Sequence, residues 1–154
     1  LYNDITYIIS MNLNLGNNSI VDSLKRGGMT NKIDIKTGTS LHPFCDRGLN
    51  NYYFHPITKE KINNIKLPYI NEVKSLVKDL SKIIKTVRYV SWDIAITNDG
   101  PILLGASPLP NIYQFFIHNE DNKGILPLIN EILNKESSVD SIEIKKDDKL
   151  SISN

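Results

Sequence analysis

The chain has 154 residues, of which 18 are Lys or Arg and 17 are Asp or Glu, a length that suits one compact domain with its own core. This near balance of charge, spread along the chain, excludes a basic surface field that would recruit nucleic acid or an anionic membrane by charge alone. No apolar run approaches the roughly 20 residues of a membrane helix, no secretory signal is recognisable, and the single cysteine, Cys45, excludes an internal disulfide, so we expect a soluble protein of the reducing cytoplasm.

Short strands are predicted in the first third of the chain. Residues 5–15 form an apolar, β-branched run that ends at turn residues, and residues 19–23 predict a second short strand. Residues 32–36 alternate polar and apolar side chains, and the turn residues 37–39 reverse the chain. Together these patterns predict a meander of half-buried strands, with one more short strand at the aromatic residues 52–54.

Two helices follow from apolar spacing. Residues 69–85 predict an amphipathic helix that packs one face on the sheet, because apolar side chains recur every three or four residues (Ile70, Val73, Val77, Leu80 and Ile84). A second helical pattern follows Gly124, with Pro127 tolerated in its first turn. The predicted fold class is α+β, a mainly antiparallel β-sheet with helices packed on one face. We expect a domain at residues 1–135 and a mobile tail at residues 136–154.

A hairpin is predicted near the end of this domain. Two apolar strands, residues 87–97 and 102–107, flank a turn that contains Gly100. A three-residue loop with Gly100 in the left-handed conformation is a common way to close such a hairpin. The resulting register sets Thr97 opposite Pro101, Ala95 opposite Leu103 and Asp93 opposite Gly105.

Asp93 is a lone acid on an otherwise apolar strand. A carboxylate in that position costs free energy unless it is solvated, hydrogen-bonded or paired with a cation, which makes it a functional candidate. The alternative is that Asp93 faces solvent or accepts hydrogen bonds from a neighbouring loop. Ser107 is expected one step further along the same face, whereas Trp92, Ile94 and Ile96 point the other way, into the core.

Basic and glycine residues offer a second candidate site. Gly27 and Gly28 can take positive φ or let a ligand approach the backbone, and Lys25 and Arg26 precede them. These two cations either reach phosphate groups or are solvated loop residues. Arg88 either contacts a phosphate or caps the end of its strand.

Several short blocks occur in a fixed order along the chain: Ile20-Val21-Asp22-Ser23 with Gly27-Gly28, Ile33-Asp34-Ile35-Lys36-Thr37-Gly38, His55-Pro56 with Thr58 and Lys61, Leu67-Pro68-Tyr69, the run from Arg88 to Thr97, and Asp99-Gly100-Pro101. In order and spacing these blocks resemble the ATP-grasp superfamily and, within it, the sugar-transfer associated ATP-grasp proteins. The resemblance covers residues 4–135, and the block at residues 88–101 is the most specific.

The resemblance implies that the chain, which starts at Leu1 within strand-like sequence, is the C-terminal part of an ATP-grasp module in a larger protein. The missing N-terminal half would complete the nucleotide cleft. In such ligases magnesium links the phosphates of ATP to acidic residues, a carboxylate substrate is activated as an acyl phosphate, and a nucleophile then attacks it. The resemblance thus implies ATP and magnesium as cofactors, an unknown carboxylate as substrate, and a link to polysaccharide synthesis.

The residues of the implied metal site depart from the family pattern. Asp93 matches the first metal-binding acid, but the family's Glu, small residue and Asn on the second strand are here Gly105, Ala106 and Ser107. The second anionic ligand is therefore lost, and the hydroxyl of Ser107 is a weak ligand for magnesium. We expect the isolated chain to be inactive. The alternatives are a degenerate, non-catalytic ATP-grasp domain kept for nucleotide or protein binding, and an incomplete gene product with no independent role.

The other conspicuous side chains are predicted to have structural roles. None of the histidines has a second ligand at metal spacing, the aromatic residues lack interleaved basic residues, and the cysteine has no sequence sign of a low pKa (His42, His55, His118, Tyr113, Phe115, Phe116 and Cys45).

Overall fold

The computed structural model describes residues 5–18, 21–84, 86–108 and 124–134. Its elements in chain order are β1 (Asn12–Leu15), η1, a 3-10 helix (Leu24–Arg26), β2 (Met29–Lys32), β3 (Phe44–Cys45), β4 (Asn51–Tyr52), α1 (Ile70–Ile83), β5 (Ser91–Thr97) and β6 (Gly100–Ser107), followed by a helix at residues 126–134. Antiparallel sheets combined with α-helices make this an α+β fold, as predicted.

The chain divides into two compact units, Leu1–His118 and Asn119–Asn154. The helix at residues 126–134 belongs to the second unit and confirms the second helical pattern. The predicted tail at residues 136–154 and the aromatic run before His118 lie outside the described residues. Within the described part of the chain, no helix is both long and apolar enough to cross a lipid bilayer.

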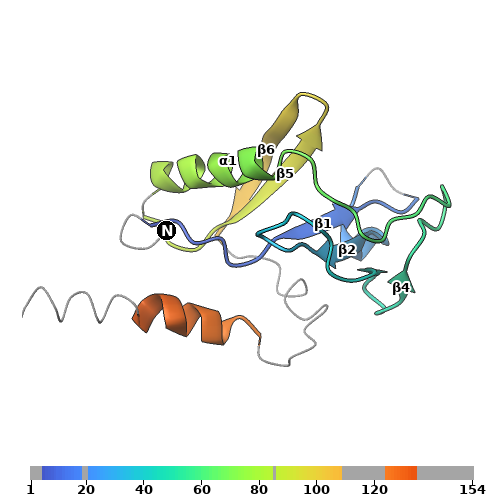
Figure 1. Cartoon of the computed structure of the whole chain (residues 1–154), viewed down its shortest axis with the longest axis horizontal. Coiled ribbons are helices and arrows are strands. Elements are labelled where there is room, and N and C mark those ends of the chain that lie inside the picture. Colours follow the sequence, from blue (N-terminus) through green and yellow to red (C-terminus); the bar gives the residue numbers. More distant parts are fainter. Residues whose placement is uncertain (1–4, 19–20, 85, 109–123, 135–154) are drawn as a thin grey trace, which may run out of the picture. The chain divides into compact units, whose positions relative to one another are not determined.

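A four-stranded antiparallel sheet fills the first part of the chain, with its strands in the order β1-β2-β3-β4 (Figure 1). The sequence predicted a meander here, but only in part from these strands: the expected strands at 5–15 and 52–54 overlap β1 and β4, that at 32–36 overlaps β2 at one residue, and β3 was not predicted.

The larger buried cluster of the sheet is small and consists of Met29, Phe44 and Ile62, with Leu13, Leu15, Tyr52 and Ile65 packed around them. Leu24 and Cys45 form a second cluster, and Ile33 is also buried. Burial of each large apolar side chain contributes about 1.5–3 kcal/mol to the stability of the fold.

Buried polar side chains on β2 are hydrogen-bonded. Asn31 is fully buried, and its side chain bonds both backbone groups of His42: Nδ2 donates to the carbonyl, and Oδ1 accepts from the N–H at 3.3 Å. The neighbouring Thr30 donates its hydroxyl to Asn14 Oδ1 at 2.8 Å. Because buried polar groups destabilise a fold unless they are paired, these bonds explain how β2 tolerates two polar residues in its interior.

Two turns of the sheet, at residues 34–39 and 55–60, share one main-chain hydrogen-bond pattern. In each, the N–H of the first residue donates to the C=O of the sixth, at 2.9 Å in the first turn and 2.8 Å in the second. The N–H of the fifth residue donates back to the C=O of the first, at 2.8 and 2.9 Å. The fifth residue is Gly38 (φ 75°) in one turn and Lys59 (φ 61°) in the other. The two turns are therefore copies of one loop structure with different side chains.

The first residue of each turn also closes it with a side-chain acceptor. Asp34 Oδ1 accepts from the N–H groups of the third and fourth residues at 2.7 and 2.8 Å, and His55 Nδ1 accepts from the equivalent groups at 3.3 and 3.2 Å. The backbone N–H of Thr37 is the main cause of the lowered pKa of the Asp34 carboxyl. Side-chain acceptors of this kind favour turns over continued strand.

A third turn is organised by Asp46. Its Oδ1 accepts from the backbone N–H groups of Gly48 at 2.8 Å and Asn50 at 3.0 Å, and its Oδ2 accepts from the Tyr52 hydroxyl at 2.9 Å. Burial alone would raise the pKa of the Asp46 carboxyl, but the hydrogen bonds from Asn50, Tyr52 and Gly48 outweigh burial and lower it. Leu49 takes positive φ at 63° to complete the turn.

Several strand boundaries differ from the predictions. Of the expected strand at 5–15 only Asn12–Leu15 forms a continuous strand, and the expected strand at 32–36 is in fact the end of β2 followed by the 34–39 turn. The described residues of the expected strand at 19–23 are not strand either, because Ser23 instead caps η1 by accepting from the N–H of Lys25 at 3.3 Å.

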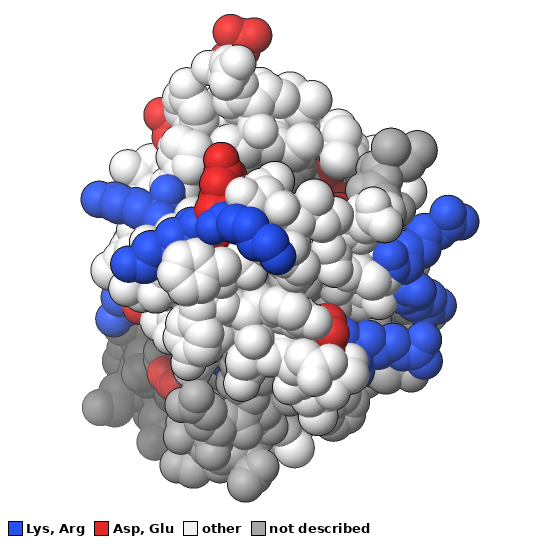
Figure 2. All heavy atoms as spheres, turned by 90° about the vertical axis from the view of Figure 1, so that its right-hand side faces the viewer, with Lys and Arg blue, Asp and Glu red and all other residues white. Residues whose placement is uncertain are grey.

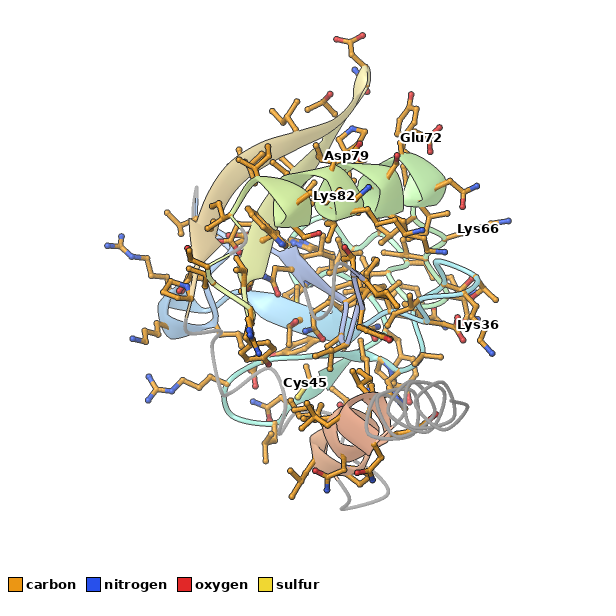
Figure 3. The ribbon with its side chains drawn as sticks, turned by 90° about the vertical axis from the view of Figure 1, so that its left-hand side faces the viewer. Lys36, Cys45, Lys66, Glu72, Asp79 and Lys82 are labelled. Atoms are coloured by element: carbon orange, nitrogen blue, oxygen red, sulfur yellow. The ribbon has the colours of Figure 1, made fainter. Side chains whose placement is uncertain are left out.

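Helix α1 lies within two residues of its predicted bounds and is tied to both sheets. Its start follows Tyr69, which has φ 55° and donates its hydroxyl to the carbonyl of Asn98 in the β5–β6 turn at 2.8 Å. Just before the helix, the Leu67 N–H donates to Gly38 C=O in the 34–39 turn at 2.8 Å. Figure 3 shows Lys36 and Lys66 at the same end of α1 as Glu72. The helix therefore links the two sheets within the first unit.

We predict that Gly38→Ala lowers the free energy of unfolding by about 1–3 kcal/mol. Position 38 has φ 75°, which an alanine side chain disfavours, and the added Cβ would lie 3.0 Å from Ile70 Cγ1 at the start of α1. Lys59→Gly at the equivalent position of the second turn is the matched control and should keep or raise stability, because it relieves a positive φ. Urea unfolding measures both; wild-type stability of Gly38→Ala would contradict the prediction.

The lowered pKa of Asp46 predicts a loss of stability in acid. A carboxyl whose pKa is lower in the folded state stabilises the fold above its unfolded pKa of about 3.9, and this contribution disappears as pH falls through the folded value. Unfolding free energy measured between about pH 6 and pH 2 should therefore fall less steeply in Asp46→Asn than in wild type, with Tyr52→Phe intermediate. Identical slopes in all three proteins would rule out this role.

Candidate functional site

The β5–β6 hairpin holds the strongest candidate residues, and its register is regular except at one point. Thr97 pairs with Gly100, so two residues, rather than the predicted three, form the turn. Gly100 does take positive φ, at 116°. Near the turn the register is therefore shifted by one residue from the prediction, and Ala95 lies opposite Ile102 rather than Leu103.

A β-bulge then restores the predicted pairing at the acid. The register shifts between Asp93 and Ile94, so that Leu104 becomes an extra residue on β6 and Asp93 pairs with Gly105. Further along, Ser107 pairs with Ser91, two residues from Asp93 and hence on the same face of the ribbon. The bulge thus brings the three positions of the implied metal site into the expected neighbourhood.

Asp93 is exposed, and its carboxylate points across the ladder at the empty position of Gly105. A Cβ built on Gly105 would lie 3.9 Å from Asp93 Oδ2, which is ordinary van der Waals contact. Gly105 is not in the positive-φ region, so the backbone accepts a side chain there. A glutamate at this position would have its Cβ next to the Asp93 carboxylate, and a dication is the usual reason that two carboxylates tolerate such proximity.

The opposite face of the hairpin is only partly buried. Trp92, Ile94 and Ile96 were expected in the core, but each is of intermediate exposure. On β6, Leu103 pairs with Ile94 on this face and is 42% exposed. Ile102, which pairs with Ala95 on the Asp93 face, is 50% exposed, and the bulge residue Leu104 is 68% exposed. The alternating pattern therefore correctly predicted that Asp93 and its apolar neighbours lie on opposite faces of the strand. It overestimated how deeply the apolar neighbours are buried.

The residues present do not fit the magnesium centre that the resemblance to ATP-grasp proteins implies. Magnesium needs several oxygen ligands and is usually held by carboxylates together with phosphates. In residues 5–18, 21–84, 86–108 and 124–134, no group of three or more His, Cys, Asp or Glu side chains is placed to hold a metal ion. At the hairpin the donors are the carboxylate of Asp93 and the hydroxyl of Ser107.

The Lys25–Gly28 loop has a structural explanation for its two glycines. Gly27 has φ 86° and ends η1, and its N–H donates to Leu24 C=O at 3.4 Å. A Cβ on Gly28 would lie 2.3 Å from the carbonyl oxygen of Asp22, so only glycine fits. The sequence suggested that these glycines either take positive φ or let a ligand approach the backbone. Gly27 has the positive φ, and the group that closely approaches Gly28 is the chain's own backbone at Asp22.

The candidate cations are exposed and lie in different parts of the first unit. Lys25 and Arg26 are on η1, next to the four-stranded sheet, and Arg88 is in the segment that leads into β5. Figure 2 shows Lys and Arg in separate groups with acidic side chains between them on the face drawn. On this face the basic side chains therefore do not form one continuous patch.

Two features of the hairpin were not predicted. One is the β-bulge at Leu104, and the other is the hydrogen bond from the Tyr69 hydroxyl to the carbonyl of Asn98. Cys45 is buried, and burial, followed by the charge of Asp46, raises the pKa of its thiol, so it is not an activated nucleophile.

Comparison with known proteins identifies the family. The sequence pattern of the sugar-transfer associated ATP-grasp family matches residues 2–134, which is most of the chain. The chain belongs to this family. No curated protein and no solved structure matches it significantly.

We predict that Gly105→Glu makes stability depend on magnesium. Without divalent metal, the variant should be less stable than Gly105→Gln by about 1 kcal/mol, because its new carboxylate faces Asp93. Added MgCl2 should raise the melting temperature of Gly105→Glu but not that of Gly105→Gln or wild type, because binding to the folded state stabilises it. Equal responses of the Glu and Gln variants would show that the two side chains do not share a metal.

Proposed function

We propose that this chain is the C-terminal part of an ATP-grasp module and that the Asp93 face of its β5–β6 hairpin lies toward the phosphates of ATP. A further segment would supply the rest of the nucleotide cleft. The family match over residues 2–134 supports the class, and the pairing of Asp93 with Gly105 supports the location. The exposed cations Lys25, Arg26 and Arg88 are proposed phosphate contacts.

The donor set argues against phosphoryl transfer by the chain alone. In ATP-grasp ligases, ATP and magnesium activate a carboxylate as an acyl phosphate, and two metals neutralise the charge of the transferring group. Here, one carboxylate and one hydroxyl on the hairpin cannot replace an Asp, Glu and Asn set. The proposed role of Asp93 is to bind or orient a cation or a phosphate-bound water, and any further ligands needed for turnover would come from the segment that completes the cleft.

A second candidate function is binding without turnover. The hairpin keeps its backbone register while the bridging glutamate is absent, which is the pattern expected of a domain retained for nucleotide or protein binding. The two candidates differ in one measurable property. The first requires ADP formation once the cleft is complete, whereas the second requires only binding.

Steady-state assays and calorimetry test the proposal. The purified chain should release no ADP from MgATP, and Gly105→Glu combined with Ser107→Asn should bind magnesium at least about tenfold more tightly than wild type. Adding Asp93→Ala to the double variant should remove this gain. Magnesium-dependent ADP release by wild type that Asp93→Ala abolishes would show that the metal site is intact and would overturn the proposal. Nucleotide binding without ADP release by the chain alone fits both candidates, whereas the same result after the further segment has been supplied would favour the second.

A further inference from the structure

The imidazole of His55 joins two segments that are far apart in the sequence. Its Nδ1 accepts from the N–H groups of Ile57 and Thr58 inside the 55–60 turn, at 3.3 and 3.2 Å. Its Nε2 lies 2.9 Å from the carbonyl oxygen of Gly16, directly after β1. The ring therefore closes its own turn and ties that turn to the end of an edge strand.

These contacts define the protonation state of the ring. Backbone N–H groups can only donate, so Nδ1 must be an acceptor and carries no hydrogen. The carbonyl of Gly16 can only accept, so Nε2 carries the hydrogen. The arrangement requires the neutral Nε2–H tautomer, and a proton on Nδ1 would face two amide donors and break the turn contacts.

The first turn shows what is specific to His55. Asp34 makes the same two backbone contacts in the 34–39 turn, with a carboxylate that has no hydrogen to donate at neutral pH. His55 differs in two respects: it adds the bond to Gly16, and histidine changes charge between about pH 5 and 8. The tether is thus present in only one of two otherwise equivalent turns.

The tether lies next to the candidate phosphate loop. Gly16 begins the connection that leads from β1 toward η1, and the next carbonyl along it, that of Asn17, is 4.0 Å from a Cβ built on Gly27. The connection held by His55 is therefore the one against which the Gly27 backbone rests. Release of Gly16 would loosen a neighbour of Lys25 and Arg26.

The ionisable side chains near the ring in sequence belong to its own turn. Within that turn, the ammonium group of Lys59 donates to Pro56 C=O at 2.5 Å, and Glu60 and Lys61 follow it. On the other side of the contact, residues 12–18 contain no ionisable side chain. No described group on that strand would compensate the charge of an imidazolium.

We propose that His55 is a pH-sensitive latch, which in its neutral form holds the Gly16–Asn18 connection on the 55–60 turn and releases it on protonation. The latch is a property of the fold and does not depend on nucleotide binding, so it can be tested without ligand. Its consequence is that the loop carrying Lys25 and Arg26 is better ordered at neutral than at mildly acidic pH.

NMR of the ¹⁵N-labelled full chain tests the latch. At about pH 7.5 the His55 ring nitrogens should show the neutral Nε2–H tautomer. On acidification to about pH 5.5, the amide resonances of Asn17, Ile57 and Thr58 should shift with the same midpoint as the ring. The protection of the Ile57 and Thr58 amides from hydrogen exchange should fall at least about tenfold over the same range. An Nδ1–H tautomer, or a ring titration that leaves all three amides unchanged, would overturn the proposal.

Two variants separate the latch from the turn. His55→Asp copies the Asp34 turn, so the Ile57 and Thr58 amides should remain protected while the Asn17 resonance no longer responds to pH. His42→Gln removes another imidazole and should retain the wild-type response. Titration of Asn17 that persists in His55→Asp would contradict the latch. If His55→Asp does not fold, the tautomer and amide titrations of wild type still decide the question.

Discussion

Hydrogen bonds from side chains to the backbone of turns are the interaction on which the four-stranded sheet depends. Its strands are only two to four residues long, so the ladders contribute few bonds, and its apolar core is small. The turns are instead closed by Asp34, Asp46 and His55, and Asn31 holds the segment before β3. Each closure offsets part of the conformational entropy lost in ordering the chain, which a small core alone would not do.

The same interactions explain which predictions failed. Apolar alternation predicted strands at residues 19–23 and 32–36, yet side-chain acceptors at Ser23 and Asp34 bind the following N–H groups and turn the chain. Helix α1 could be predicted because its apolar spacing extends over several turns. The shared structure of the 34–39 and 55–60 turns could not, since Asp-Ile-Lys-Thr-Gly-Thr and His-Pro-Ile-Thr-Lys-Glu have little in common apart from a threonine at the fourth position.

At the candidate site the predicted pairing was right although its derivation was partly wrong. A three-residue loop without a bulge and a two-residue turn with a bulge both place Asp93 opposite Gly105. The bulge depends on local twist and packing at Leu104, which a linear pattern does not encode. The sequence alone was sufficient to show that the residue opposite Asp93 is glycine, because the identity of residue 105 does not depend on how the register arises. The glycines before β2 are different. The sequence alone cannot tell whether Gly28 makes room for a ligand or for the chain's own backbone, and the structure shows that it makes room for the backbone of Asp22.

The open position at Gly105 bears on how much a single substitution can change in this hairpin. Because its φ is ordinary and an added Cβ would make only van der Waals contact with Asp93, a side chain can be introduced there without any change of backbone, turn or bulge. The two strands therefore act as a fixed frame, and the chemistry beside Asp93 can be altered one residue at a time.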